Sequence, residues 1–169
     1  MTETAHQVSA RIATEEDLPT LVARESEAAR GNAAESMALQ AEGSYYLVVG
    51  LIDGQIAGHA ALDFRESNPL RPEVKNLFVY PEARRKGLGA TISEFLEETA
   101  AELGFDEIFL GVTPDNPAAI PMYISLEYSP TGEHRSALNL AVLEPVGDQL
   151  ITDDSEPTEA IYRKSLRMR

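Results

Sequence analysis

Hydrophobic positions along the chain fall into short runs of strand length, separated by longer stretches with helical spacing. Short apolar runs bounded by turn residues predict β-strands. They cover Val8–Ile12, Tyr45–Ile52, Gln55–Phe64, Glu73–Tyr80 and Glu107–Thr113, with further strands expected within Tyr128–Leu143 and Ala160–Arg167. The dipeptide Asp53-Gly54 separates two of these runs, which is a strong signal for a tight hairpin.

Helical spacing begins near Thr14, which stands three residues before Asp17 in the manner of a capping box. From there, two helical pieces are expected up to about Leu39. A longer helix is expected from Gly87, with acidic residues opposite its apolar face, and Gly104 ends it.

A short helix over Asn116–Leu126 would use Asn116 as its N-cap and Pro117 as its first residue. Pro121 lacks a backbone N–H, so we expect a kink or a displaced helix start. The alternation of strands and helices around Glu73–Leu126 implies parallel pairing, whereas the hairpin implies antiparallel pairing. The pattern therefore predicts one α/β domain over residues 1–169, with a mixed sheet flanked by helices.

Composition excludes several classes of site. The chain has no cysteine, and His6, His59 and His134 lie far apart, so no metal site is expected. A net charge of −14, from 28 acidic and 14 basic residues, disfavours binding to nucleic acid or to anionic membranes. The polar start of the chain lacks the apolar run of a signal peptide, so a cytoplasmic location is expected.

Three consecutive cations stand out in this acidic chain. Arg84, Arg85 and Lys86 come directly before Gly87-Leu88-Gly89, where the long helix is expected to begin. Helix N-termini expose unpaired N–H groups, glycines let the backbone approach a phosphate, and Arg binds phosphate oxygens in pairs. The turn is a candidate pyrophosphate cradle, and it lacks the residues that define a P-loop or a dinucleotide fingerprint. By itself it is also compatible with a solvated basic turn.

With these residues the chain resembles the GNAT superfamily of N-acetyltransferases. The family signature, Gln/Arg-x-x-Gly-x-Gly/Ala after a strand and a proline-containing turn, is matched by Arg84 to Gly89. A second family element, an Asn with an Ala three and a Tyr seven residues on, is matched by Asn116, Ala119 and Tyr123. The resemblance implies a GNAT-like fold, whose central, mostly antiparallel sheet is splayed at the cofactor strand.

The resemblance also implies acetyl-CoA as co-substrate, no metal, and a set of site residues. The implied cofactor-binding residues are Leu77, Phe78, Val79, Arg84, Arg85, Lys86, Gly87, Leu88, Gly89, Ala90 and Asn116. The amide of Val79 would polarise the thioester carbonyl, and Tyr123 would protonate the departing thiolate. Asn116 as a helix cap only, and Tyr123 as an ordinary half-buried aromatic residue, remain alternatives.

The acceptor amine must lose a proton before it can attack. Glu73 begins the cofactor strand, where some family members carry a base, and it is the second catalytic candidate; the alternative is a solvated strand end. Other members place a base five residues before the Asn, which here is Gly111. Strand alternation would put Glu73 on the face of Val79 and opposite to Phe78.

Other polar residues are candidates to line the acceptor site. They are His59 and Asp63 on the hairpin and His134 and Arg135 after the short helix. The family has Gly-Phe where this chain has Glu127-Tyr128, which puts the C-terminal cap of the short helix in doubt.

The leading hypothesis is an N-acetyltransferase in which a primary amine attacks acetyl-CoA directly in a ternary complex. The alternatives are an acyl-CoA-binding regulatory module without turnover and a scaffold that binds no CoA. The acceptor would be a small-molecule or peptide amine, and the acidity of the chain favours a cationic one. No nucleic acid or membrane partner is expected, and a homodimer is an open alternative to a monomer.

Overall fold

The computed structural model describes residues 6–112, 119–136, 143–145 and 158–166. The chain falls into two compact units. The first comprises Met1–Asp63 and Lys75–Thr99, and the second comprises Phe64–Val74 and Ala100–Arg169. The single-domain prediction stays a prediction.

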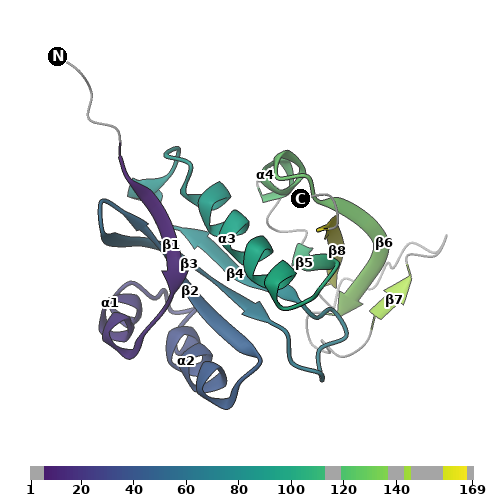
Figure 1. The fold of residues 1–169 in the computed structure, drawn as a ribbon, viewed down its shortest axis with the longest axis horizontal. Helices are drawn as coiled ribbons and strands as arrows, with labels where there is room; N and C mark the ends of the chain where they lie inside the picture. The colour runs from purple at the N-terminus through teal and green to yellow at the C-terminus, as the bar shows by residue number, and fades with distance from the viewer. Residues whose placement is uncertain (1–5, 113–118, 137–142, 146–157, 167–169) are drawn as a thin grey trace. The chain divides into compact units, whose positions relative to one another are not determined.

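The first unit contains strands in the order β1 (Val8–Ile12), β2 (Tyr45–Ile52), β3 (Gln55–Asp63) and β4 (Glu73–Val79), of which β4 begins in the second unit (Figure 1). The pairs β1–β2 and β2–β3 are antiparallel. Asp53 and Gly54, which join β2 to β3, have φ of 51° and 83°, as the turn of a tight two-residue hairpin requires. The predicted hairpin is therefore confirmed.

Five helical segments of the described residues belong to the first unit wholly or in part. They are the 3₁₀ turns η1 (Glu15–Asp17) and η2 (Pro81–Ala83) and the helices α1 (Leu18–Ala23), α2 (Asn32–Glu42) and α3 (Leu88–Glu102). The carboxylate of Asp17 accepts the backbone N–H of Thr14 at 2.8 Å, which confirms the predicted capping interaction. It also accepts two hydrogen bonds from Arg11, at 2.7 and 2.9 Å. The long helix begins at Leu88, one residue after the predicted start.

The two faces of β2 pack against different helices because side chains alternate along a strand. Leu47 and Val49 form a buried cluster with Leu21 of α1 and Ala33 of α2. Gly50 points to the opposite face, where a Cβ atom would lie 2.6 Å from Ile92 Cδ1 of α3. The helices α1 and α2 therefore cover one face of this sheet and α3 covers the other (Figure 1).

The second unit holds the strand order β4, β5 (Glu107–Val112), β8 (Thr158–Ser165), β6 (Ser129–Ser136) and β7 (Leu143–Pro145). Its β4–β5 ladder is parallel and consists of two pairs, Glu73 with Phe109 and Val74 with Leu110. The β5–β8, β6–β8 and β6–β7 ladders of this unit are antiparallel. The mixed α/β sheet with mostly antiparallel pairing is confirmed, and the short parallel ladder agrees with the splaying that the resemblance implied.

Strand β4 differs from the prediction in length and in regularity. It ends at Val79 rather than Tyr80, and only Glu73 and Val74 are buried. Asn76 has a φ of 55°, a left-handed conformation that Asn tolerates better than most residues. From Lys75 to Val79 half-buried and exposed residues still alternate, as predicted, whereas Glu73 and Val74 at the start of the strand are both buried.

The short helix α4 is described over Ala119–Ser125, with Pro121 in the first turn of that stretch; Asn116 and Pro117 lie outside the described residues. After α4, Glu127 has a φ of 74° and donates its N–H to Ile124 O, and Tyr128 donates to Tyr123 O. This is a helix C-cap in which Glu127 takes the conformation that glycine usually supplies. The loss of glycine therefore does not abolish the cap.

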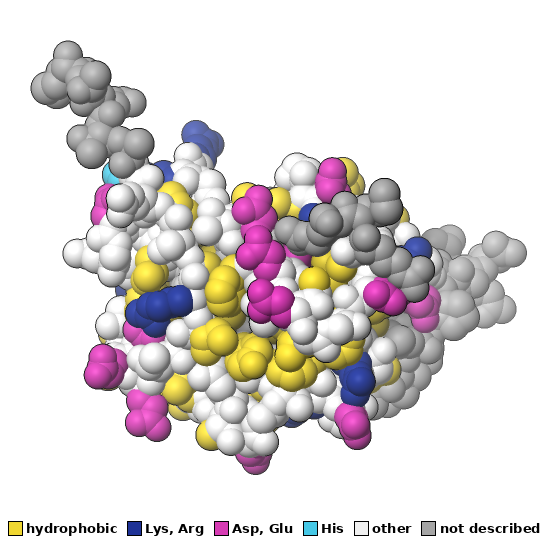
Figure 2. All heavy atoms as spheres, in the orientation of Figure 1, with side chains coloured by type: hydrophobic (Ala, Val, Ile, Leu, Met, Phe, Trp, Pro, Cys, Tyr) yellow, Lys and Arg dark blue, Asp and Glu magenta, His cyan; other side chains and the backbone are white. Residues whose placement is uncertain are grey.

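The surface shows the excess of acidic over basic residues that the sequence has (Figure 2). Asp and Glu side chains are spread over the face seen in Figure 2 together with fewer Lys and Arg, so on this face the acidity is not gathered into one patch. Within the described ranges, none of the helices has the length and apolar character needed to cross a membrane.

Candidate functional site

The glycine-rich turn lies between β4 and α3, as predicted. After the 3₁₀ turn η2 (Pro81–Ala83), Arg85 has a φ of 67° and Gly87 a φ of 81°. The carbonyl of Gly87 accepts the N–H of Thr91 at 3.1 Å, so Gly87 is the residue from which α3 starts. The first N–H groups of α3 have no partner within the helix, which leaves them available to an anion.

The three cations of this turn are exposed but differ in their contacts. The Nε of Arg84 donates to Val79 O at 3.0 Å, and its guanidinium lies 5.3 Å from the centre of the Phe78 ring. Lys86 lies close enough to Asp53 to help lower the pKa of that carboxyl, whose largest cause is the hydrogen bond from His6. Arg85 has no ion-pair partner in the described part of the chain.

Space around the turn fits a phosphate group. A Cβ atom added at Gly87 would meet no atom within 4 Å, and the positive φ of this residue favours glycine. The neighbouring Leu88 differs, because its side chain is 1% exposed and belongs to the core of the unit. Only the backbone of Leu88 is therefore available to a ligand, whereas Gly89 and Ala90 are half-buried in the first helical turn.

The end of β4 that precedes the turn is partly open to solvent. Phe78 is 42% exposed, and Leu77 and Val79 are half-buried. Strand β3 approaches closely at Gly58, where a Cβ would lie 2.7 Å from Phe78 O. Glycine at this position allows β3 to pack directly against the backbone of the predicted cofactor strand.

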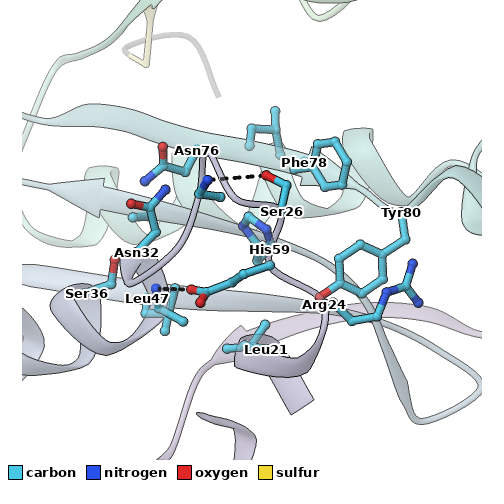
Figure 3. A pocket seen from close by; sticks show the side chains of 15 residues that line it. Leu21, Arg24, Ser26, Asn32, Ser36, Leu47, His59, Asn76, Phe78 and Tyr80 are labelled. Atoms are coloured by element: carbon cyan, nitrogen blue, oxygen red, sulfur yellow. Dashed lines mark hydrogen bonds between the residues drawn. The ribbon is translucent and has the colours of Figure 1, made fainter. Parts of the chain in front are cut away.

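A cavity of about 280 Å³ lies within the first unit (Figure 3). Its walls come from α1, α2, the segment between them, and strands β2, β3 and β4. The lining residues are Leu21, Arg24, Glu25, Ser26, Ala29, Asn32, Ala33, Ser36, Leu47, His59, Ala61, Asn76, Leu77, Phe78 and Tyr80. Three consecutive residues of β4, Asn76 to Phe78, are among them.

His59 is the residue of this cavity with the most useful chemistry. It pairs with Val49 across the hairpin, so its ring lies on the face that α1 and α2 cover. The ring is hydrogen-bonded to the backbone of Asn76 and lies 5.9 Å from the Phe78 ring, centre to centre. Burial lowers the pKa of His59, while the hydrogen bond with Asn76 and the charge of Glu25 act in the opposite direction.

The two charged side chains that line the cavity, Glu25 and Arg24, both contact other residues of the first unit. Glu25 accepts the N–H groups of Gly31 at 3.2 Å and Ala33 at 2.9 Å, and so caps α2. The guanidinium of Arg24 stacks 3.9 Å from the centre of the Tyr80 ring and pairs with Glu82.

Tyr80 carries a polar atom that is not satisfied. Its side chain is 3% exposed, and its hydroxyl has no hydrogen-bond partner among the described residues. Burial raises the pKa of this phenol, so it stays protonated at neutral pH. Buried polar groups almost always find a hydrogen-bond partner, so this hydroxyl is unusual.

Glu73, the predicted base, lies in the second unit within a buried network. Its two oxygens accept hydrogen bonds from Arg135 at 2.7 and 3.1 Å, and Asn68 donates a third at 2.9 Å. Arg135 also binds Glu159 at 2.8 Å. Glu73 is 2% exposed, so the alternative of a solvated strand end is wrong. Its role as a base stays a prediction, and these contacts support a structural role.

The same network accounts for Gly111. A Cβ at this position would lie 2.9 Å from Glu159 Oε2 and 3.1 Å from Arg135 Nη2. No side chain fits there without moving the pair. The glycine is therefore explained by packing, since the carboxylate of Glu159 from β8 fills the space beside it.

The remaining predicted residues lie in the second unit or outside the described residues. Tyr123 is half-buried on α4, and its ring meets that of Tyr128 edge-on with centres 6.1 Å apart. Burial raises the pKa of Tyr123, which keeps the phenol protonated at neutral pH. Asn116 is outside the described residues, so its role stays a prediction.

Of the four residues predicted to line the acceptor site, only one lines the cavity. His59 lines the cavity, whereas Asp63 is fully buried and binds Lys75 at 2.9 Å. Arg135 is committed to the Glu73 network, and His134 is not among the residues that line the cavity. Within the described ranges, no group of three or more His, Asp or Glu side chains is placed to hold a metal ion.

Sequence reasoning missed the cavity residues Arg24, Glu25, Asn76 and Tyr80. Arg24 and Glu25 lie in a segment without a motif, whereas Asn76 and Tyr80 lie on the predicted cofactor strand, which gave no sign that they would line a cavity. The one available signal was His59, a polar residue on a predicted half-buried strand.

Comparison with known proteins identifies relatives. Residues 11–128 match the model of the acetyltransferase (GNAT) family. An uncharacterized N-acetyltransferase in the pepI 3′ region of Lactobacillus delbrueckii subsp. lactis is 30% identical over 88 residues, which are 49% of this chain and 51% of the relative. The match thus spans about half the length of that relative.

Solved structures share the fold. An N-acetyltransferase from Staphylococcus aureus Mu50 superposes with a TM-score of 0.68 at 16% identity, covering 95% of this chain and 99% of the other. The putative acetyltransferase yncA from Salmonella typhimurium, solved with its cofactor acetyl-CoA, gives a TM-score of 0.65 at 19% identity, covering 95% and 94%. At these identities the likeness concerns the fold alone.

Proposed function

Because the chain belongs to the GNAT acetyltransferase family, we propose that it transfers the acetyl group of acetyl-CoA to the nitrogen of a primary amine. The observation that carries the proposal is the turn from Arg84 to Gly89, where exposed cations and a left-handed glycine precede a helix N-terminus. Such a turn supplies backbone N–H groups, positive charge and room for a pyrophosphate.

The cofactor would be held by residues of the first unit. The backbone of Gly87 to Ala90 and the side chains of Arg85 and Lys86 would bind the pyrophosphate. The exposed edge of β4 at Leu77 to Val79 would pair with the pantetheine arm, and the Val79 amide would face the thioester carbonyl. When bound, acetyl-CoA supplies an activated acyl carbon with a thiolate leaving group.

Two further roles would fall to Tyr123, in the second unit, and to Asn116, which lies outside the described residues. Tyr123, kept protonated by burial, would donate its proton to the leaving thiolate. Asn116 would contact the pantetheine arm. The cavity beside β3 and β4 would receive the acceptor, since its lining includes Leu77 and Phe78 of the strand that would carry the thioester.

Release of CoA thiol from acetyl-CoA in the presence of a panel of primary amines tests this function. We expect amine-dependent thiol release, with one N-acetylated product formed per thiol, as mass spectrometry can count. Acetyl-CoA binding without thiol release for any amine would favour a regulatory acyl-CoA-binding module. Absence of acetyl-CoA binding would overturn the proposal altogether.

A further inference from the structure

The cavity of the first unit has walls that are mostly apolar and a volume suited to a small molecule. The apolar residues of its lining include Leu21, Leu47, Ala61, Leu77 and Phe78. A volume of about 280 Å³ lies at the lower end of the range of small-molecule sites, as expected for a ligand of amino-acid size.

The cavity is poorly equipped to bind an ammonium ion. Glu25 is the only carboxylate among the described residues that line it, and both of its oxygens already accept N–H groups at the start of α2. The other charged side chain is Arg24, a cation. An ammonium group transferred from water into such surroundings loses hydration without gaining a free carboxylate, so the neutral amine is favoured there.

His59 is placed to act on such an amine. Its ring faces the cavity and is oriented by the hydrogen bond to the backbone of Asn76, which occupies one of its two nitrogens. The ring also lies beside Phe78 and Tyr80, at 5.9 and 6.2 Å between centres. Gly58, its neighbour on β3, packs against the backbone of Phe78, so the imidazole is fixed next to the strand segment that would carry the thioester.

We propose that the cavity binds a weakly basic primary amine on an apolar body of amino-acid size, and that the His59 nitrogen not engaged with Asn76 accepts the proton this amine loses on acetylation. The inference rests on the proposed function and deepens it. It replaces the expectation of a cationic acceptor, which rested on net charge alone, and assigns to His59 the proton transfer that the sequence suggested for Glu73.

The atoms balance as follows. The amine nitrogen bonds to the acetyl carbon, the carbon–sulfur bond breaks, and the electron pair leaves on sulfur. His59 takes one proton from the attacking nitrogen and returns it to solvent after the product leaves. The thiolate receives its proton from the phenol of Tyr123, which regains one from solvent.

The weak basicity of His59 favours acceptor amines of low pKa. A neutral imidazole is a weak base, and burial lowers the pKa of His59 further, although the Asn76 hydrogen bond and the charge of Glu25 raise it. Arg24 and Tyr80 are the other titratable residues of the described cavity lining. An α-amino group has a pKa of about 8 and an alkylamine about 10, so at neutral pH the neutral fraction differs by roughly 100-fold. A proton acceptor like His59 therefore suits α-amino and similar groups.

The test compares phenylalanine amide, an α-amino compound, with phenethylamine, which has the same ring but an alkylamine, and with spermidine. We expect kcat/KM at neutral pH to be at least about tenfold higher for phenylalanine amide, with the gap closing as pH rises. Equal or better use of phenethylamine or spermidine at neutral pH would overturn the inference while leaving the proposed function intact. No thiol release with any amine would instead count against the proposed function.

His59→Gln isolates the role of the ring. The variant should lower kcat/KM for phenylalanine amide about 100-fold and abolish the fall in rate on acidification that reports His59, while acetyl-CoA affinity measured by calorimetry stays the same. His6→Gln, at an exposed histidine that binds Asp53, is the matched control. In NMR titrations of the parent protein without cofactor, the His59 ring should titrate below its ordinary pKa and shift when phenylalanine amide is added. Superimposable pH–rate profiles of parent and His59→Gln, or a ring signal unaffected by the amide, would rule His59 out.

Discussion

Tyr123 is a residue whose environment matches its proposed role only in part. Burial raises the pKa of its phenol, which secures the proton at neutral pH but also makes the phenol a weaker acid. Proton transfer to the thiolate is then favourable only as negative charge builds on sulfur in the transition state. A role of this kind affects turnover and leaves binding almost untouched.

Replacing Tyr123 by Phe should therefore lower kcat about 100-fold, with little change in the dissociation constant of acetyl-CoA. Steady-state thiol release and calorimetry measure the two quantities on the same preparation. Tyr46→Phe, at a half-buried tyrosine of β2, serves as the control. Undiminished kcat in Tyr123→Phe would return this residue to its structural alternative.

At the scale of elements, β4 has different environments at its two ends. Its first residues are buried in the second unit, where Glu73 binds Arg135, whereas Leu77 to Val79 form a partly exposed edge in the first unit. The left-handed conformation of Asn76 separates the two ends. We infer that Glu73 fixes the start of the strand while the end of the strand serves the ligand.

Glu73→Gln should reveal which role the carboxylate has. Removing one partner of a buried ion pair costs about 3–5 kcal/mol, because Arg135 keeps its charge with less compensation. Urea unfolding should therefore show a large loss of stability in Glu73→Gln. Glu107→Gln breaks an exposed pair with Arg163 and should change stability by less than about 1 kcal/mol. Normal stability in Glu73→Gln, together with slow turnover that recovers at high pH, would support the catalytic prediction instead.

The sequence predicted the strand-length runs, the hairpin and the glycine-rich helix start, because each depends on neighbouring residues alone. Asp53-Gly54 and Gly87 are examples, since their positive φ angles follow from residue type. It did not predict the left-handed Asn76 or the left-handed cap at Glu127, since both occur at residues that usually adopt other conformations. The Glu73–Arg135 pair was also missed, because its partners are 62 residues apart.

For the whole molecule, the negative net charge of the chain opposes the binding of an anionic ligand such as acetyl-CoA. The chain carries −14, and acetyl-CoA is itself an anion, so long-range repulsion opposes binding and local cations must overcome it. Arg85 and Lys86 are exposed at the glycine-rich turn, whereas Arg84 is already bonded to Val79 O. Most of the electrostatic attraction for acetyl-CoA is therefore expected to come from Arg85 and Lys86.

Calorimetric titration of acetyl-CoA into the parent and into the double variant Arg85→Ala, Lys86→Ala tests this central claim most directly. Hydrogen bonds to charged groups contribute about 1.5–3 kcal/mol each, so the double variant should bind at least about tenfold more weakly, and added salt should weaken the parent more than the variant. Arg30→Ala, at an arginine that is 78% exposed, should bind like the parent. An unchanged dissociation constant in the folded double variant, or no binding of acetyl-CoA to the parent, would contradict the account.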